Sequence, residues 1–393
     1  MTLLKRTNLI YITAFAIRLA MFNFPSVANT LADRIELSTP ITSFKRLTEG
    51  IYLYNHNVPP YDGDAFHQLP LLLCLFSFIM SFPFSNTIPF LYSTVDIIIA
   101  YALSRIAQLK ENTTISPSTV AALYLFNPLT ILSCVSRSTI IFTNFSMVLS
   151  LLSALKGHSH QAMFWIALGA YQSLYPIMLV PVLIMILNNN ISIVGSFVVY
   201  LTGLFAMSRL YVGSWSFIRA TYGIILFLSD LTPNVGMFWY FFIEIFDQFR
   251  SFFMVAFQFH MFIFTAPICI RLRKQPIFAM TVLCSIMAIF KSYPSAGDAA
   301  FYLSLVSMHD ELFKYCRYGF LVSNLFLYAS VLAPIFWHLW IYAGSGNANF
   351  FYAITLVYNL GQVLLLIDLV YAALRREFDL EHPESIGKLV IHK

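Results

Sequence analysis

The chain has 393 residues, of which 59% are hydrophobic and only 10% are charged, and its mean hydropathy is +0.74. A helix crosses a bilayer with about 20 apolar residues, and such stretches cover nearly the whole sequence, so composition excludes a water-soluble globular protein. The net charge of +5 is spread without a basic run, so we expect no nucleic-acid partner. The composition predicts an all-α fold: a polytopic transmembrane helical bundle of about 10–12 spans in a single integral membrane domain, 1–393.

Clusters of Arg and Lys near span ends predict the orientation of the chain, because such clusters favour the cytosolic side. Placing the four clearest clusters in the cytosol gives a self-consistent membrane topology. These clusters lie at 5–6, 105–110, 271–274 and 375–376. The predicted parts are a first span at 1–25, a lumenal loop with an interfacial helix at 26–69, the remaining spans at 70–374 with lumenal loops near 211–236 and 343–349, and a cytosolic tail at 375–393.

The first outer loop predicts a helix followed by a turn. Phe44, Leu47 and Ile51 recur at helical spacing with charged residues between them, which is typical of an amphipathic helix lying in the membrane interface. Asp62 and Asp64 then form a D-x-D pattern, whose carboxylate oxygens would suit Mg²⁺ or Mn²⁺. Asp and Gly after two prolines are equally typical of a turn. Because no third ligand follows nearby, we predict a turn and no metal site.

Asp33 and Glu36, just after the first span, are the candidate acids for catalysis. A spacing of one helical turn would suit general-base work on a lipid-linked sugar. Alternatively, the two acids favour the start of a helix, or Asp33 pairs with Arg34. The chain has no G-x-S-x-G, H-E-x-x-H or P-loop sequence. We therefore predict no catalytic residue and no cofactor.

Lys291 and Asp298 bracket a polar segment between two predicted spans. Ionisable groups at such a boundary are candidates for a functional site. Lys291 would meet a lipid phosphate, and Asp298 a sugar hydroxyl or an amine. The alternative is that the two side chains pair with each other, or that Lys291 extends to the interface.

A polar island interrupts an aromatic membrane segment near the end of the chain. It reads Gly-Ser-Gly-Asn-Ala-Asn at 344–349, between a Trp-rich stretch and a Phe-rich one. Trp and Tyr concentrate at the membrane interface, and irregular backbone exposed to lipid is not tolerated. We therefore expect the island to line a cavity or to pack against protein. It is either an anchored turn between two spans or a headgroup site that uses Ser345, Asn347 and Asn349.

Six segments give the chain a resemblance to a known family, the PIG-U subunits of glycosylphosphatidylinositol (GPI) transamidase, called Gab1 or CDC91-like in yeast. The segments follow one another over nearly the full chain in the order of the family. They read LADRIELSTPITSFKRLTEGIYL, FNPLTILSCVSRST, YQSLYP, SDLTPNVGMFWYFF, IFKSYPSAGDAAFYLSL and WHLWIYAGSGNANFFYAITL.

The resemblance implies a multi-pass, non-catalytic subunit in the endoplasmic reticulum membrane. In this family the catalytic cysteine belongs to a PIG-K/Gpi8-like subunit, and the other partners are PIG-T-, PIG-S- and GAA1-like. The implied role is to bind and present the GPI lipid for attachment to the C-terminus of precursor proteins, with membrane phospholipid as a further partner. We expect Ser345, Asn347 and Asn349 to bind GPI, with Lys291 and Asp298 as further candidates.

The family is also similar to multispan (GT-C-like) glycosyltransferases that use dolichol-linked sugars, which carry an acidic motif after the first span. Here Arg34 stands beside Asp33, and a neighbouring guanidinium would engage that acid. The alternatives to lipid presentation are therefore a dolichol-phosphate-sugar-dependent transferase using Asp33 or Glu36, or a purely structural scaffold. We predict a transferase-like fold reused for binding.

Overall fold

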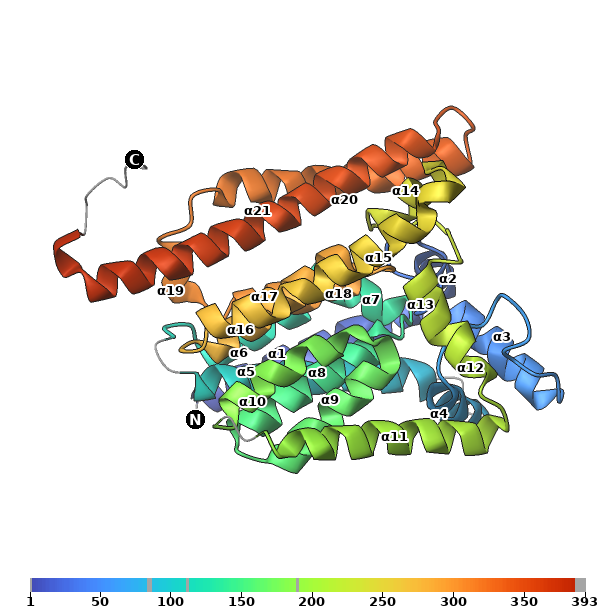
Figure 1. The fold of residues 1–393 in the computed structure, drawn as a ribbon, viewed down its shortest axis with the longest axis horizontal. Coiled ribbons are helices and arrows are strands. Elements are labelled where there is room, and N and C mark those ends of the chain that lie inside the picture. The colour runs from blue at the N-terminus through green and yellow to red at the C-terminus, as the bar shows by residue number, and fades with distance from the viewer. Residues whose placement is uncertain (1, 83–86, 111–112, 189–190, 386–393) are drawn as a thin grey trace. The chain divides into compact units, whose positions relative to one another are not determined.

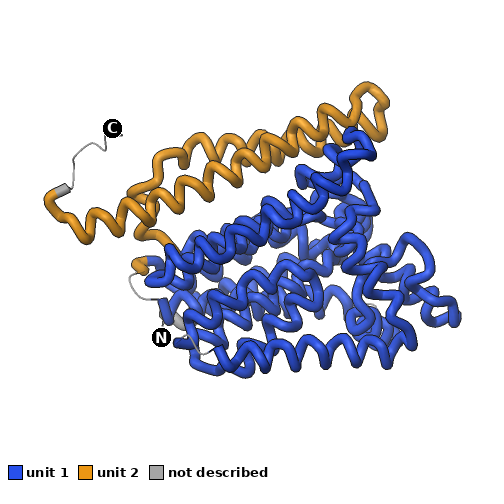
Figure 2. Tube along the Cα trace, viewed as in Figure 1, with its two compact units in different colours: residues 1–111, 115–308 blue, residues 112–114, 309–393 orange. Residues whose placement is uncertain are grey.

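The regular elements of the computed structural model are all helices in the part of the chain that it describes (Figure 1). That part comprises residues 2–82, 87–110, 113–188 and 191–385. The all-α fold predicted from the sequence is confirmed. The chain falls into two compact units (Figure 2), and the single integral membrane domain stays a prediction. Unit 1 comprises 1–111 and 115–308, and unit 2 comprises 112–114 and 309–393.

Unit 1 begins with an apolar helix, α1, that breaks sharply before the outer loop. Pro25 opens α2 at its first position, where the missing N–H is no loss, and the axes of α1 and α2 meet at 89°. The predicted outer-loop helix is confirmed as α3, with Phe44, Leu47 and Ile51 buried. The helices of this part are α1 (Thr2–Phe22), α2 (Pro25–Ala32), α3 (Phe44–Asn55), α4 (Pro70–Met80) and α5 (Thr87–Leu109).

The middle of unit 1 is broken by prolines and by side-chain caps. Asn127 accepts a hydrogen bond from the N–H of Leu129 at 2.9 Å and so starts a new helix at Pro128, at 53° to the helix before it. The predicted outer loop at 211–236 itself contains short helices. The elements here are α6 (Pro117–Leu125), α7 (Pro128–Val135), α8 (Ile140–Leu155), α9 (Ser159–Ser173), η1 (Tyr175–Leu179), α10 (Val180–Ile186), α11 (Ile193–Val212), α12 (Ser216–Ile218), η2 (Arg219–Gly223) and α13 (Ile224–Phe227).

The last part of unit 1 returns to the core made by the earlier helices. In that core α8 packs against α9 and α5, and α9 packs against α11. The helix α17 is buried along nearly its whole length and packs against α18, which in turn contacts α7. The remaining helices are α14 (Phe238–Glu244), α15 (Asp247–Ile263), α16 (Thr265–Arg271), α17 (Pro276–Phe290) and α18 (Ala296–Val306).

A fully buried charge pair joins three helices of this core. Arg18 on α1 is 0% exposed and donates from Nε to Oδ2 of Asp96 on α5 at 2.5 Å. The Tyr124 hydroxyl on α6 donates to Oδ1 of the same carboxylate at 2.6 Å. Asp96 lies 78 residues from Arg18 along the chain, so the sequence shows two isolated charges where the fold makes one neutral cluster.

The number of helices long and apolar enough to cross a membrane is lower than the predicted 10–12 spans. Within the described residues there are five, or up to seven if each of two bent pairs counts as one span. Six further apolar stretches form helices of 10–17 residues, among them α4, α8 and α17. The prediction of about 10–12 spans counts these shorter stretches as well.

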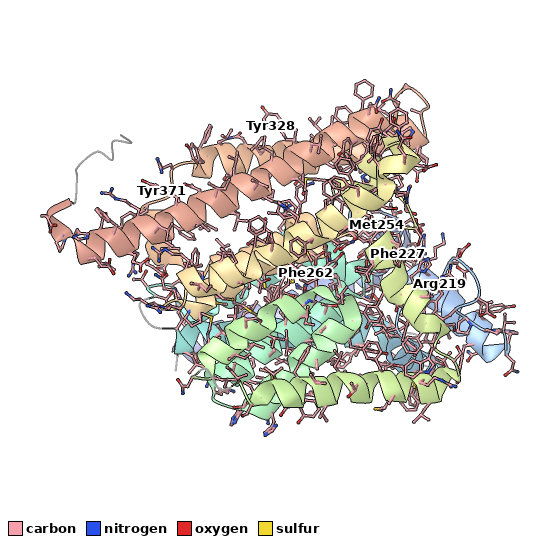
Figure 3. The ribbon with its side chains drawn as sticks, viewed as in Figure 1. Arg219, Phe227, Met254, Phe262, Tyr328 and Tyr371 are labelled. Carbon is pink, nitrogen blue, oxygen red and sulfur yellow. The ribbon has the colours of Figure 1, made fainter. Side chains whose placement is uncertain are left out.

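Unit 2 is a long helical hairpin with a short helix before it. Asp368 on α21 accepts hydrogen bonds from the N–H groups of Arg317 and Tyr318, which directly precede α20. The guanidinium carbon of Arg317 lies 3.4 Å from the ring centroid of Tyr371, a residue of α21 that is labelled in Figure 3. The last helix continues into the predicted tail as far as Glu381. The elements are α19 (Asp310–Phe313), α20 (Gly319–Ile341), α21 (Ala348–Glu381) and η3 (Pro383–Ser385).

Gly50 on α3 marks a contact that only glycine permits. A Cβ atom there would lie 2.6 Å from the ring of Phe66, which is itself buried. We expect Gly50→Ala to destabilise the chain by about 1–3 kcal/mol, as overpacking does, measured as a lowered melting temperature in detergent. Gly63→Ala is the control, because no atom lies within 4 Å of its added Cβ. An equal melting temperature for both variants would contradict this packing.

Candidate functional site

The polar island at 344–349 forms the turn of the unit 2 hairpin. The helix α20 ends at Ile341, and Gly344 adopts a φ of +63°, which a residue without a Cβ reaches easily. The N–H groups of Ser345 and Gly346 both donate to the carbonyl of Leu339 at 3.0 Å. The predicted break between two spans is therefore confirmed, and its backbone is fixed by local hydrogen bonds.

Asn347 is the N-cap of α21, which the sequence did not specify. Its Oδ1 accepts hydrogen bonds from the N–H groups of Asn349 at 3.1 Å and Phe350 at 3.3 Å. Capping occupies the oxygen of this amide and leaves its NH₂ group for other acceptors. The side chains of Ser345, Asn347 and Asn349 are all exposed.

An aromatic cluster supports the turn from within unit 2. The ring centroids of Trp337 and Trp340 lie 5.4 Å apart, and those of Trp337 and Phe351 lie 5.3 Å apart. Phe351 is fully buried, whereas Phe350 and Tyr342 are 53% and 71% exposed. The buried Phe351 ring and the half-buried Trp rings hold the turn in place, and the exposed rings stand next to the polar side chains.

The island is exposed in the structure of the single chain, so its expected place in a cavity or against another protein stays a prediction. The three polar side chains stand at a helix N-terminus, where one amide caps the backbone and the others point outward. The three cavities described for this protein are lined by residues of unit 1.

Lys291 and Asp298 form an ion pair with each other inside unit 1. Lys291 Nζ lies 2.6 Å from Asp298 Oδ1, and the two side chains are 3% and 11% exposed. The other carboxylate oxygen accepts from the N–H and the hydroxyl of Ser295, which is a capping box at the start of α18. The sequence left open whether Lys291 and Asp298 pair with each other or Lys291 extends to the interface, and the structure shows the mutual pair.

Two small cavities adjoin this pair. The first, of about 30 Å³, is lined by Gln68, Gln172 and Lys291, and the second, of about 10 Å³, by Asn144, Lys291 and Asp298. The side-chain oxygens of all three amides are buried and accept no hydrogen bond from a described residue. A cavity needs about 10–15 Å³ for one water, so these spaces suit a few waters and are too small for a sugar.

The candidate catalytic acids are separated rather than paired. The helix α2 ends at Ala32, before both acids. Glu36 receives two hydrogen bonds from Arg34, at 3.0 and 2.5 Å. Asp33 lies 3.3 Å from Lys45 in an exposed pair. The expectation that Arg34 engages Asp33 is wrong, because the chain turns after α2 and brings Glu36 to the guanidinium. Each acid is therefore paired with a basic residue and not with the other acid.

A second charge cluster ties the outer loop to the segment after α11. Arg46 Nη1 lies 2.8 Å from Asp230 Oδ2. Burial opposes ionisation of Asp230, but hydrogen bonds from Thr232 and then the Arg46 charge outweigh it, so the pKa of Asp230 is lowered. Burial lowers the pKa of His67, although both ring nitrogens meet backbone carbonyls, at 2.9 Å for Ala220. Sequence spacing gives no signal for this cluster.

Asp62 and Asp64 are exposed and lie in the predicted turn. Among the described residues, no three His, Cys, Asp or Glu side chains come together as a metal site would need. The D-x-D pattern therefore gains no third ligand from elsewhere in the described fold.

Comparison with known proteins gives consistent matches along the chain. The sequence model of the family described as "GPI transamidase subunit PIG-U" matches residues 12–358. The chain is 37% identical to human "GPI-anchor transamidase component PIGU" over 95% of each chain. It is 41% identical to "GPI transamidase component GAB1" of Saccharomyces cerevisiae over 93% of each, and 34% identical to the Schizosaccharomyces pombe homolog over 91%. The chain belongs to the PIG-U family of GPI transamidase subunits.

Proposed function

We propose that the chain is a non-catalytic, multi-pass subunit of a GPI transamidase in the endoplasmic reticulum membrane, where it helps to bind and present the GPI lipid. The observation that carries this proposal is the polar turn at 344–349. Its exposed amides and hydroxyl stand beside exposed rings at the end of two long apolar helices. A polar lipid needs such a place, where headgroup donors meet an apolar surface.

The surface of the hairpin below the turn suits acyl chains. Leu327 and Val331 on α20 and Leu360 and Ile367 on α21 are all at least half exposed. Apolar side chains at this depth lie against hydrocarbon at no cost. The turn would then donate hydrogen bonds to the inositol-phosphate end or the glycan root while the chains follow the helices.

The chemistry of transfer is assigned to a partner. The chain's five cysteines stand singly in the sequence, and Cys134, Cys269 and Cys284 are buried. We propose that the nucleophile lies on a PIG-K/Gpi8-like subunit, with PIG-T-, PIG-S- and GAA1-like subunits completing the complex. In that arrangement this subunit supplies the acceptor lipid and another subunit supplies the reactive thiol.

Lys291 and Asp298 are secondary candidates for contact with GPI. Asp298 is held by their mutual pair and by the cap of α18, and its carboxylate is the acceptor of the ammonium group. A lipid phosphate would have to replace Asp298 at the ammonium group. The island needs no such exchange, and for this reason it is the principal site of the proposal.

The test of the island is Asn347→Asp. Aspartate caps a helix as well as asparagine does, but it lacks the NH₂ donor and repels a phosphate. Loss of such a hydrogen bond costs about 1–3 kcal/mol, so we expect GPI use to fall about fivefold to a hundredfold. The measurement is surface display of a GPI-anchored reporter in cells that depend on the variant, at equal levels of assembled complex.

The same exchange at another exposed amide is the matched control. Asn57 lies in the outer loop with a φ of +59°, a conformation that aspartate tolerates, so Asn57→Asp should leave the reporter unchanged. Normal display in Asn347→Asp and in the Asn347→Ala/Asn349→Ala double variant would refute the site and favour the scaffold alternative. If these variants lost display only together with the assembled complex, that result would also favour the scaffold alternative.

A further inference from the structure

Arg137 stands out because the fold holds it in a conformation that its side chain does not favour. It lies between α7 and α8 with a φ of +59°. Its N–H donates to the carbonyl of Cys134 at 3.0 Å, and its own carbonyl accepts from the buried Tyr92 hydroxyl at 2.7 Å. A left-handed non-glycine residue persists only where its surroundings over-determine it, and such residues cluster at functional sites.

The guanidinium of Arg137 is held in place by neighbouring side chains, but no carboxylate of the described residues pairs with its charge. Its carbon lies 5.0 Å from the centroid of the Phe44 ring, and Nη2 donates to Oδ1 of Asn29 at 2.8 Å. Nε is buried without a partner, and within the described part of the chain no carboxylate pairs with Arg137 and no acceptor meets Nη1. By contrast, Arg18, Arg34 and Arg46 each contact an acid.

The surroundings place this group at the level of lipid headgroups. Asn29 belongs to α2, which leaves the apolar helix α1 at 89° and exposes Phe24 and Val27 at its start. This geometry fits a short helix that lies in the membrane interface at the end of a span. In that position Asn29 would orient the Arg137 side chain at the level of the headgroups.

Charges nearby leave the patch positive. Asp33 lies one turn beyond Asn29 and interacts with Arg137 over distance, but its ion pair is with Lys45 at 3.3 Å. That pair is largely exposed, at 60% and 77%, so water screens it. One carboxylate faces two cations, which leaves a net positive charge for an anion to balance.

We propose that Arg137 and Asn29 form a site for the phosphate of a membrane phospholipid, with Nη1 and Nη2 of the guanidinium donating to its oxygens. Arginine suits this task because its planar fork matches two phosphate oxygens. The Phe44 ring fixes the plane of the fork, and Asn29 fixes its rotation. The site belongs to unit 1 and is separate from the island, so it does not depend on the proposed role in GPI presentation.

Two variants test the site through different physical changes. Arg137→Gly removes the guanidinium at a backbone position where glycine is favoured, and so relieves strain. Asn29→Asp keeps Arg137 in place but supplies a carboxylate that competes with phosphate. We expect each variant to lower phospholipid retention roughly tenfold to a hundredfold, as the loss of a charge-assisted hydrogen bond does. Arg34→Gln, at a cation already held by Glu36, is the control and should retain lipid.

The measurement uses the whole purified complex. It is incubated with vesicles of phosphatidylcholine and deuterated phosphatidylinositol and re-isolated, and the deuterated lipid bound per complex is counted by mass spectrometry. Lower retention in Arg137→Gly and Asn29→Asp, with normal retention in Arg34→Gln, supports the site. Equal retention in all four proteins overturns it. Release of the deuterated lipid by inorganic phosphate would show a site for the free anion and overturn the lipid assignment.

Discussion

Replacing Arg18 by leucine is expected to destabilise the chain by about 3–5 kcal/mol, the usual cost of removing one partner of a buried ion pair. Asp96 is 1% exposed and would keep only the Tyr124 hydroxyl as a partner. Arg18 also donates to the carbonyls of Ala14 and Leu125, at 3.1 and 3.0 Å. The variant therefore loses contacts among α1, α5 and α6 at once.

The double variant Arg18→Leu/Asp96→Leu separates charge from packing. Apolar replacement of a whole buried pair is often close to neutral, so we expect the double variant to recover most of the lost stability. Melting in detergent, followed by size-exclusion chromatography of the variants, measures both effects. Lys156→Ala, at an exposed lysine, is the control and should stay within about 0.5 kcal/mol. An Arg18→Leu melting temperature equal to that of this control would contradict the argument.

The sequence was sufficient where local pattern determines the structure. The apolar spacing of Phe44, Leu47 and Ile51 predicted α3, and the Gly-Ser-Gly-Asn island predicted the turn between α20 and α21, because turn chemistry and helical period are local. The pattern failed where short apolar stretches end in caps, such as the one that Asn127 forms. Hydropathy averages over such caps, and so it does not show where one helix ends and the next begins.

Local turns and contacts between distant residues account for the rest of what the sequence did not predict. Arg34 was expected to engage Asp33, its neighbour, but the turn after α2 gives it Glu36 instead. The setting of Arg137 depends on Phe44, Asn29 and Tyr92, which come from three other helices. A single sequence does not show which residues of different helices come into contact. These neighbours of Arg137 could therefore be identified only from the fold.

Lys291→Met is expected to destabilise unit 1 by about 3 kcal/mol. The change leaves the Asp298 carboxylate, which is 11% exposed, without the ammonium group at 2.6 Å. The hydrogen bonds from Ser295 remain, which is why we expect the lower end of the range for a broken buried pair. The melting temperature of the purified protein measures the loss, with Lys156→Ala again as the control.

The second substitution, Asp298→Asn in the Lys291→Met background, decides between structure and ligand binding. Asparagine can still accept from Ser295, so the cap of α18 survives and the uncompensated charge is gone. We expect stability to return to within about 1 kcal/mol of the parent. Because the ammonium and carboxylate groups pair with each other, we expect display of the GPI reporter to recover as well. If stability returns while display stays low, the ammonium and carboxylate groups themselves contact the substrate. In that case the GPI headgroup reaches the space beside Gln68 and Asn144, which would have to open beyond its present volume.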